Sequence, residues 1–247
     1  DTYGFPLELT EEIANEKGIS VDINGFENEM AKQRKRAKDA SVSIDLTEEG
    51  SIEREISLFD ETRFEGYEKL ETTSTVIGIF KNNELVKQAV EGDLVKIIVN
   101  RTPFYAESGG QIGDKGLITS QDLEVSIENV RKKKNIFIHS GIVNTGVLKV
   151  NSSVQMNVTP SFRQRTTSNH TATHLLQSAL KLSIDSSVSQ RGSLVSNDRL
   201  RFDFNAPKPL TIKELEDMEV RINQWINEDH PIQIKTMPIK EAMAAGA

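Results

Sequence analysis

The chain has 247 residues, of which 36% are hydrophobic and 27% charged, and its formal net charge is −7. This balance is typical of a folded globular protein and excludes a disordered chain, while the acidic charge argues against a wholly basic nucleic-acid binder. Because there is no cysteine and no apolar run near the roughly 18 to 20 residues of a membrane span, these residues also hold no disulfide framework, thiolate metal ligand or transmembrane helix.

The first part of the chain, residues 1–62, has the pattern of a helical segment. Thr10 can cap a helix whose first turn is acidic, which suits the positive end of the helix dipole. Asp22 can start a second helix with an apolar face. A basic run follows, formed by Lys32, Arg34, Lys35, Arg36 and Lys38. The polar stretch 41–57 is either a linker or a loosely held helix.

Residues 63–160 change to the pattern of short strands. The segment 75–86 predicts a hairpin, because two apolar runs flank the turn residues Asn82 and Asn83. Further strands are expected at 94–99, 123–127, 136–138 and 154–158. Several short strands at this spacing predict a small β-barrel.

Residues 161–247 return to helices with a few strands. A helix is expected over 170–181, a strand over 200–204 and a second helix after the capping box of Thr211 and Glu214. Asp229-His230-Pro231 should end that helix, and Ile232, Ile234 and Thr236 indicate a last strand. The expected fold class is therefore α+β: an N-terminal helical segment, a small β-barrel, and a two-layer α+β unit truncated at its C-terminus.

Two of the four histidines, His170 and His174, lie four residues apart on the first expected helix of this last part. That spacing places both imidazoles on one face, about one turn apart, as a shared metal ion requires. A protease of the His-Glu-x-x-His type needs a glutamate base after the first histidine, and Thr171 stands there instead. What remains is half of a metal site, or two ordinary surface or core histidines.

Polar residues surround the two histidines, namely Thr166, Thr167, Ser168, Asn169, Thr171 and Thr173. On an ordinary amphipathic helix so many polar residues would be unusual, which favours a site. Ser168 or Asn169 could also cap the helix, so part of this cluster has a purely structural explanation.

Two further segments could carry chemistry. Residues 102–114 combine three glycines with a proline, so the backbone of this loop can approach another group closely. It is not a phosphate-binding loop, because no Gly-Lys-Ser/Thr follows. The alternative is a structural loop that closes the barrel against the next unit. Residues 189–194 form a polar turn entering a strand, and the alternative there is a plain loop.

The remaining histidines and the basic patches have simpler explanations. His139 and His230 are isolated and are interpreted as structural, His230 as a helix C-terminal residue before Pro231. The run Arg131 to Lys134, like the basic run of residues 32–38, is either a solvated surface or a local nucleic-acid patch.

With these segments identified, the chain closely resembles the alanyl-tRNA synthetase family. The matching segments are DTYGFPLELT (1–10), TPFYAESGGQIGDKG (102–116), NHTATHLLQSALK (169–181), SQRGSLV (189–195) and LRFDF (200–204). They occur in the family's order and cover essentially the whole chain. The second and third segments are also shared with free-standing editing proteins, which lack the DTYGFP lead-in. One departure is Asn205-Ala206, where the family often has Ser-His.

The resemblance implies a fragment that covers the end of the tRNA-recognition region (1–62), a β-barrel subdomain (63–160) and an incomplete editing core (161–247). The family's editing site hydrolyses tRNA(Ala) wrongly charged with serine or glycine. It holds zinc through two histidines, matched by His170 and His174, and through a later cysteine and histidine that this chain does not contain. The catalytic residues implied near the pocket are Gln190, Thr173 and Asn169.

The resemblance also implies the partners and location. The parent ligates alanine to tRNA(Ala) in the cytoplasm, with ATP and magnesium used in an aminoacylation domain absent here. The expected partner is the tRNA(Ala) acceptor end, without membrane or DNA. One alternative is a non-catalytic tRNA-contacting fragment, inert because half of the zinc ligands are missing. Another is an unrelated zinc hydrolase that recruits Glu107 or Asp203.

Overall fold

The computed structural model describes residues 10, 13–14, 17–32, 55–56, 58–206, 208–233 and 235–245, and it divides into two compact units, Asp1–Leu58 and Phe59–Ala247. In the first unit residues 23–32 are helical, and the Asp22 carboxylate accepts the backbone N–H of Gly25 at 2.9 Å. The predicted helix start at Asp22 is therefore confirmed. Thr10 is itself helical, and most of the basic run and of the stretch 41–57 lies outside the described residues.

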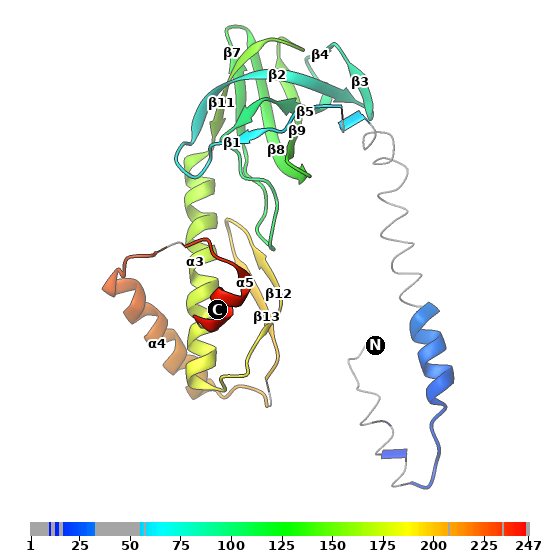
Figure 1. Ribbon diagram of the computed structural model, residues 1–247, viewed down its shortest axis with the longest axis vertical. Coiled ribbons are helices and arrows are strands. Elements are labelled where there is room, and N and C mark those ends of the chain that lie inside the picture. The colour runs from blue at the N-terminus through cyan, green and yellow to red at the C-terminus, as the bar shows by residue number, and fades with distance from the viewer. Residues whose placement is uncertain are drawn as a thin grey trace. The chain divides into compact units, whose positions relative to one another are not determined.

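The second unit begins with a closed barrel of six antiparallel strands (Figure 1). Around the barrel the strands follow the order β11-β7-β8-β9-β5-β2, and pairing of β2 with β11 closes the ring. Their bounds are β2 Glu71–Lys81, β5 Leu94–Val99, β7 Gly116–Ser120, β8 Leu123–Lys133, β9 Ile136–Thr145 and β11 Ser153–Val158. The predicted small β-barrel is confirmed.

Short strands complete this part of the unit. β3 (Glu84–Val86) forms the predicted hairpin with β2, and both turn residues, Asn82 and Asn83, have positive φ. β4 (Gln88–Val90) pairs with β10 (Val147–Lys149), and β1 (Arg63–Phe64) pairs in parallel with β6 (Arg101–Thr102). β3 is an added seventh strand beside β2, and the other two pairs form separate two-stranded sheets outside the closed ring.

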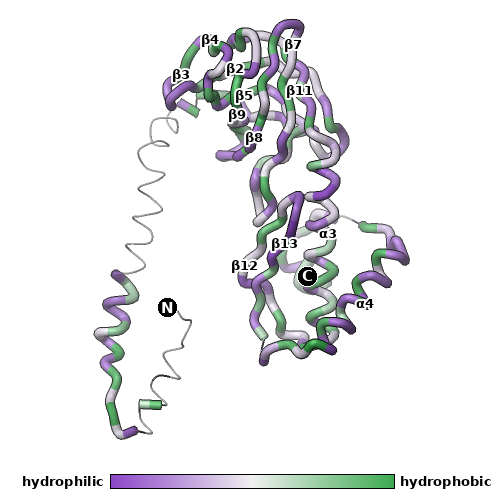
Figure 2. Tube along the Cα trace, turned by 180° about the vertical axis from the view of Figure 1, so that it is seen from behind, coloured by the Kyte–Doolittle hydropathy of each residue, from purple (hydrophilic) through white to green (hydrophobic). Residues whose placement is uncertain are grey.

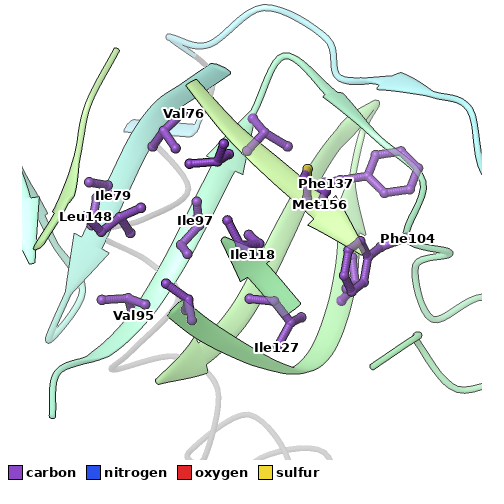
Figure 3. Close-up of a cluster of buried hydrophobic side chains, with 14 of the residues drawn as sticks. Val76, Ile79, Val95, Ile97, Phe104, Ile118, Ile127, Phe137, Leu148 and Met156 are labelled. Carbon is purple, nitrogen blue, oxygen red and sulfur yellow. The ribbon is translucent and has the colours of Figure 1, made fainter. Parts of the chain in front are cut away.

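Alternating side chains from the six strands fill the barrel interior (Figure 3). Residues from opposite walls meet there, among them Val76, Ile97, Ile118, Ile127 and Met156, all 0–1% exposed. The alternation follows from the two-residue period of a strand, which sends every second side chain to the same face. The barrel is thus a packed core and a rigid support for the loops at its rim.

A long helix, α3 (Pro160–Ser183), leaves the barrel after β11. A hairpin of β12 (Gln190–Val195) and β13 (Leu200–Phe204) lies on one side of α3, and α4 (Ile212–Glu228) lies on the other (Figure 1). Helices and hairpin share a core of Ala179, Leu180, Val188, Phe202 and Met218. Apolar and polar residues alternate in bands along α4, as an amphipathic helix requires (Figure 2).

The capping box at the start of α4 is confirmed, because Thr211 and Glu214 bond reciprocally. The helix expected over 170–181 begins earlier, at Pro160, since proline suits the first helical position and Thr159 precedes it in extended conformation.

The strand predicted at 232–236 is wrong. Its described residues are outside any strand, and Ile232 is 73% exposed. β12 and β13 form a two-stranded sheet, and no third described strand pairs with them. Apolar residues at alternate positions form a strand only where a partner edge is available. The segment instead leads to the short helix α5 (Ile239–Ala244). Within the described residues, no helix has the length and apolar character needed to cross a bilayer.

Candidate functional site

The segment 103–115, here called the glycine-rich loop, runs from β6 to β7 and extends from the barrel to the β12–β13 hairpin (Figure 1). Ile112 N–H donates to the Val195 carbonyl at 3.0 Å, and Val195 N–H donates to the Gly110 carbonyl at 2.8 Å. Gly110 has a φ of 83°, and a Cβ there would lie 2.5 Å from the Ser193 carbonyl oxygen. Glycine is required at this close approach.

An ion pair fixes the end of the glycine-rich loop to α3. Asp114 is 1% exposed, and Nε of Arg163 lies 3.0 Å from each of its carboxylate oxygens. The same guanidinium donates to the carbonyls of Gly66 at 2.6 Å and Pro103 at 2.8 Å, while Tyr105 N–H donates to Asp114 at 2.7 Å. Because every charged atom has a partner, these interactions offset the cost of removing both charges from water.

The two candidate metal ligands, His170 and His174, are adjacent on α3. Their rings stack with centroids 5.1 Å apart and planes 22° apart. Nδ1 of His170 lies 2.6 Å from Oε1 of Gln111, a residue of the glycine-rich loop 59 positions earlier that is only 4% exposed. The loop therefore contacts His170 directly, which the sequence pattern did not indicate for Gln111.

This contact sets the proton position on His170. A carboxamide oxygen only accepts hydrogen bonds, so Nδ1 must carry the proton and Nε2 is left with its lone pair. Burial, with a further contribution from neighbouring His174, lowers the pKa of His170 below its ordinary value. Both effects favour a neutral imidazole that offers Nε2 as a ligand, as a metal-binding histidine requires.

The polar cluster on α3 is explained mainly by contacts within the helix. Hydroxyls of Thr166, Thr167 and Ser168 donate to carbonyls three or four residues earlier, so Ser168 is inside the helix and not its cap. Thr173 is 7% exposed and donates to the carbonyl of Asn169 at 2.8 Å. The amide of Asn169 in turn donates to the Ser196 carbonyl at 2.8 Å, which joins α3 to the end of β12. The prediction that Ser168 or Asn169 caps the helix is therefore wrong.

Gln190 begins β12 and is exposed. Its amide nitrogen donates to the Ser193 hydroxyl at 3.1 Å, and Ser193 is the residue against which Gly110 packs. Gln190 therefore reaches the glycine-rich loop through Ser193, whereas Gln111 reaches His170 directly. The structure brings His170, His174, Asn169 and Thr173 together on α3, and Gln190 lies on the neighbouring hairpin.

The donor set can be compared with what zinc requires. Two imidazoles on one helix face provide two of the four ligands of a tetrahedral site. Among the described residues, no group of three or more His, Asp or Glu side chains could hold a metal ion. Glu107 and Asp203, which an unrelated zinc hydrolase would recruit, pair instead with Arg131 at 3.6 Å and Arg201 at 3.2 Å. The residues fit half of a zinc site.

The other two histidines are placed as predicted. His139 is fully buried inside the barrel, where Nδ1 lies 3.1 Å from the Ile97 carbonyl and Nε2 lies 2.8 Å from the Thr102 hydroxyl. Burial lowers its pKa to about 4. His230 follows the end of α4 and bonds to Glu228 at 2.7 Å.

Comparison with known proteins identifies the protein family to which the chain belongs. The family model of class II (A) tRNA synthetases matches residues 1–161, and the chain belongs to this family. The particular members that it resembles are alanine–tRNA ligases, as the sequence motifs indicated. The chain is 97% identical to the alanine–tRNA ligase of Prochlorococcus marinus strain NATL1A and 96% identical to that of strain NATL2A.

A more distant relative gives the same result. The alanine–tRNA ligase of Synechococcus sp. strain RCC307 is 52% identical over all 247 residues. In each of these comparisons the whole chain is matched, and it spans 28% of the relative's length. The resemblance therefore covers the histidine pair and the β12–β13 hairpin as well as the segment matched by the family model.

Proposed function

We propose that this chain carries most of the editing domain of an alanine–tRNA ligase, which hydrolyses seryl- and glycyl-tRNA(Ala). The observation that carries the proposal is the contact of Gln111 with His170, at 2.6 Å, beside the stacked His174. It orients the imidazole of His170, on which His174 stacks, where the glycine-rich loop contacts both α3 and β12. The ATP-dependent ligation of alanine is proposed to lie outside these 247 residues.

His170 and His174 would hold zinc, completed by ligands from outside this chain. Zinc bound there would supply a Lewis acid near the aminoacyl ester. Gln111 would keep His170 in the tautomer whose Nε2 is unprotonated, and the Asp114–Arg163 pair would keep the glycine-rich loop against α3. With two of the four ligands present, the isolated chain is expected to bind zinc weakly and to be inactive.

Thr173 and Gln190 are proposed to contact the amino acid. The Thr173 hydroxyl uses its proton for the Asn169 carbonyl, so its oxygen is left to accept a hydrogen bond from the hydroxyl of serine. Gln190 is exposed at the start of β12, and its amide could orient the ester. Asn169 would hold the hairpin in place through Ser196.

Such a second site is needed on energetic grounds. A pocket shaped for alanine gains only about 1–3 kcal/mol from one methyl group, so it rejects glycine weakly and cannot fully exclude serine. A polar site that recognises the serine hydroxyl can separate the two amino acids because alanine leaves its hydrogen-bonding groups unpaired. The partner implied is the 3′ end of tRNA(Ala).

The test is hydrolysis of Ser-tRNA(Ala) by a full-length ligase carrying this chain. His170→Ala and Gln190→Ala should each slow hydrolysis by tenfold or more while alanine ligation is retained. His230→Ala is the matched control, because His230 lies beyond α4 and should have the wild-type rate. Wild-type hydrolysis by His170→Ala would overturn the assignment, and wild-type hydrolysis by Gln190→Ala alone would exclude the role given to Gln190.

A second candidate function is a non-catalytic tRNA-contacting fragment. The incomplete donor set among the described residues favours it for the isolated chain. The two candidates differ in the full-length ligase, where only the editing function predicts that His170→Ala lowers hydrolysis.

A further inference from the structure

Four aromatic rings cluster between the barrel rim and the start of the glycine-rich loop. Phe64 is at the centre: its ring lies 5.0 Å from Tyr67 and 6.2 Å from Tyr105, edge to face, and 5.4 Å from Phe137, stacked at 10°. The ammonium group of Lys132 lies 5.8 Å from the centre of the Phe137 ring. These five residues line a small hollow of about 110 Å³, here called the aromatic pocket.

The ring of Tyr67, on the outer side of the aromatic pocket, contributes little to the stability of the fold. Tyr67 is 87% exposed, so its ring contributes little buried area to the fold. Its contact with Phe64 is edge to face, and most of the ring remains open to solvent. Tyr105, which is partly buried, has its pKa raised mainly by burial and stays an uncharged phenol. An exposed ring supported by a second ring is a surface on which a flat group can stack.

A cationic turn borders the aromatic pocket. Four successive basic residues, Arg131 to Lys134, occupy the end of β8 and the turn to β9, together called the β8–β9 turn here, in a chain whose net charge is −7. Two acidic groups lie beside it: Glu107 is 3.6 Å from Arg131, and Glu61 accepts a hydrogen bond from Asn135 at 2.8 Å. The local excess of positive charge is therefore opposite in sign to the rest of the chain, as an anionic partner requires.

The aromatic pocket is continuous with the glycine-rich loop. Ser108 and Lys132 line both this pocket and a second hollow of about 300 Å³ formed with Glu107, Gly109, Gly110 and Arg131. Gly110, which lines the second hollow, directly precedes Gln111, and the side chain of Gln111 contacts His170. A strand lying along the two hollows would lead to the histidine pair.

We propose that the aromatic pocket and the β8–β9 turn bind an unpaired nucleotide of single-stranded RNA, with its base on the Tyr67 ring and its phosphates against the basic residues. Aromatic rings bind bases of any sequence, while basic side chains bind the backbone. This combination suits RNA better than a protein partner, whose surface would not need four cations beside one exposed ring. The inference rests on the proposed function only in identifying the RNA as the acceptor strand of tRNA.

The test uses the 247-residue chain and two fluorescently labelled RNA hairpins. One hairpin ends in four unpaired 3′ nucleotides and the other is blunt. Tyr67→Ala should weaken binding of the overhanging hairpin by about tenfold, and binding of the blunt hairpin by much less, because base stacking is lost. Tyr67→Phe keeps the ring and should restore affinity. Since Tyr67 is exposed, the alanine variant should fold, which its circular dichroism and melting temperature would check.

The contribution of the basic residues to RNA binding is tested separately. Lys132→Ala should weaken both hairpins and reduce the slope of log affinity against log salt by about one. Lys149→Ala removes the same charge from the exposed end of β10 and should leave the slope unchanged. Unchanged affinity for the overhanging hairpin in Tyr67→Ala, or equal effects of Lys132→Ala and Lys149→Ala, would overturn the proposal. So would binding that is lost in the full-length ligase because another segment covers Tyr67.

These outcomes can be separated from failure of the proposed function. If Tyr67→Ala binds RNA normally while His170→Ala abolishes Ser-tRNA(Ala) hydrolysis, the editing site stands and the aromatic pocket is not an RNA site. If Tyr67→Ala weakens binding while His170→Ala hydrolyses normally, the RNA site stands and the editing assignment fails.

Discussion

Asp114 and Arg163 form a buried ion pair that fastens the glycine-rich loop to the first turns of α3. Gln111 and His170 make a second contact between the same two elements, about two helical turns further along α3. Residues two turns apart face the same side of a helix, so the loop is held to one face of α3 at both places. Two contacts, only one of which involves His170, thus hold the glycine-rich loop beside the histidine pair.

Replacing Arg163 should therefore destabilise the unit strongly. Arg163→Met leaves the carboxylate of Asp114, 1% exposed, without its cation, and the expected loss in unfolding free energy is about 3–5 kcal/mol. Urea denaturation of the 247-residue chain measures it. The control is Arg199→Met, which removes an exposed arginine 3.7 Å from Asp198 and should cost less than about 1 kcal/mol. Equal losses would contradict a structural role for the buried pair.

The backbone approach at Gly110 gives a second prediction. Gly110→Ala would force a Cβ to within 2.5 Å of the Ser193 carbonyl oxygen, so the loop should separate from β12. The matched control is Gly109→Ala, which has a similar positive φ of 59° but no atom within 4 Å of the added Cβ. Gly109→Ala should cost only about 1 kcal/mol of backbone strain, and Gly110→Ala more. Hydrogen exchange at the Val195 amide, which bonds to Gly110, should accelerate in Gly110→Ala alone.

His139 should make the barrel sensitive to acid. Its pKa of about 4 in the folded state lies below the ordinary value of 6.5, so the folded protein binds fewer protons than the unfolded chain between these two values. Stability from this group is complete above pH 6.5, is lost as the pH falls towards 4, and amounts to about 3 kcal/mol.

The measurement is the pH dependence of unfolding free energy for wild type and His139→Gln. Glutamine can still bond to Thr102 and Ile97 but does not titrate. Between pH 6.5 and 4 the unfolding free energy of wild type should fall more steeply than that of the variant. The difference in slope should reach about 1.4 kcal/mol per pH unit. Parallel curves for the two proteins would show that His139 does not titrate as its burial requires.

Gln111 is expected to position His170. In Gln111→Leu the acceptor for Nδ1–H is removed, so His170 should change from one protonated nitrogen to a mixture of tautomers. Nitrogen-15 shifts of the imidazole in the 247-residue chain report this directly, and the shifts of His174 serve as the internal reference. In the full-length ligase the same variant should bind zinc about 10- to 100-fold more weakly. An unchanged tautomer would show that the 2.6 Å contact does not orient the ring.

Local patterns were sufficient to predict most of the fold. Alternating residues such as Val125 and Ile127 identified the strands, and the positions of Thr211 and Glu214 identified the start of α4. The start of α3 was missed because the polar residues before His170 resemble caps, although they bond to carbonyls within the helix. A strand near Ile232 was predicted wrongly because alternation does not show whether a partner edge exists.

The contacts that build the candidate site could not be predicted in the same way. Asp114 and Arg163 are 49 residues apart in the sequence, and Gln111 and His170 are 59 apart. The periodicity of a helix or strand therefore cannot relate the members of either pair. The histidine pair was visible because a helix brings residues four apart to one face. The roles of Gln190, Thr173 and Asn169 remain predictions from family resemblance.

The most direct test compares zinc content and Ser-tRNA(Ala) hydrolysis of the 247-residue chain with those of a full-length ligase carrying it. An editing site with half of its ligands in this chain predicts one zinc and hydrolysis in the full-length ligase, both lost in His170→Ala, and neither in the short chain. Stoichiometric zinc in the short chain, or hydrolysis that survives His170→Ala, would contradict the account.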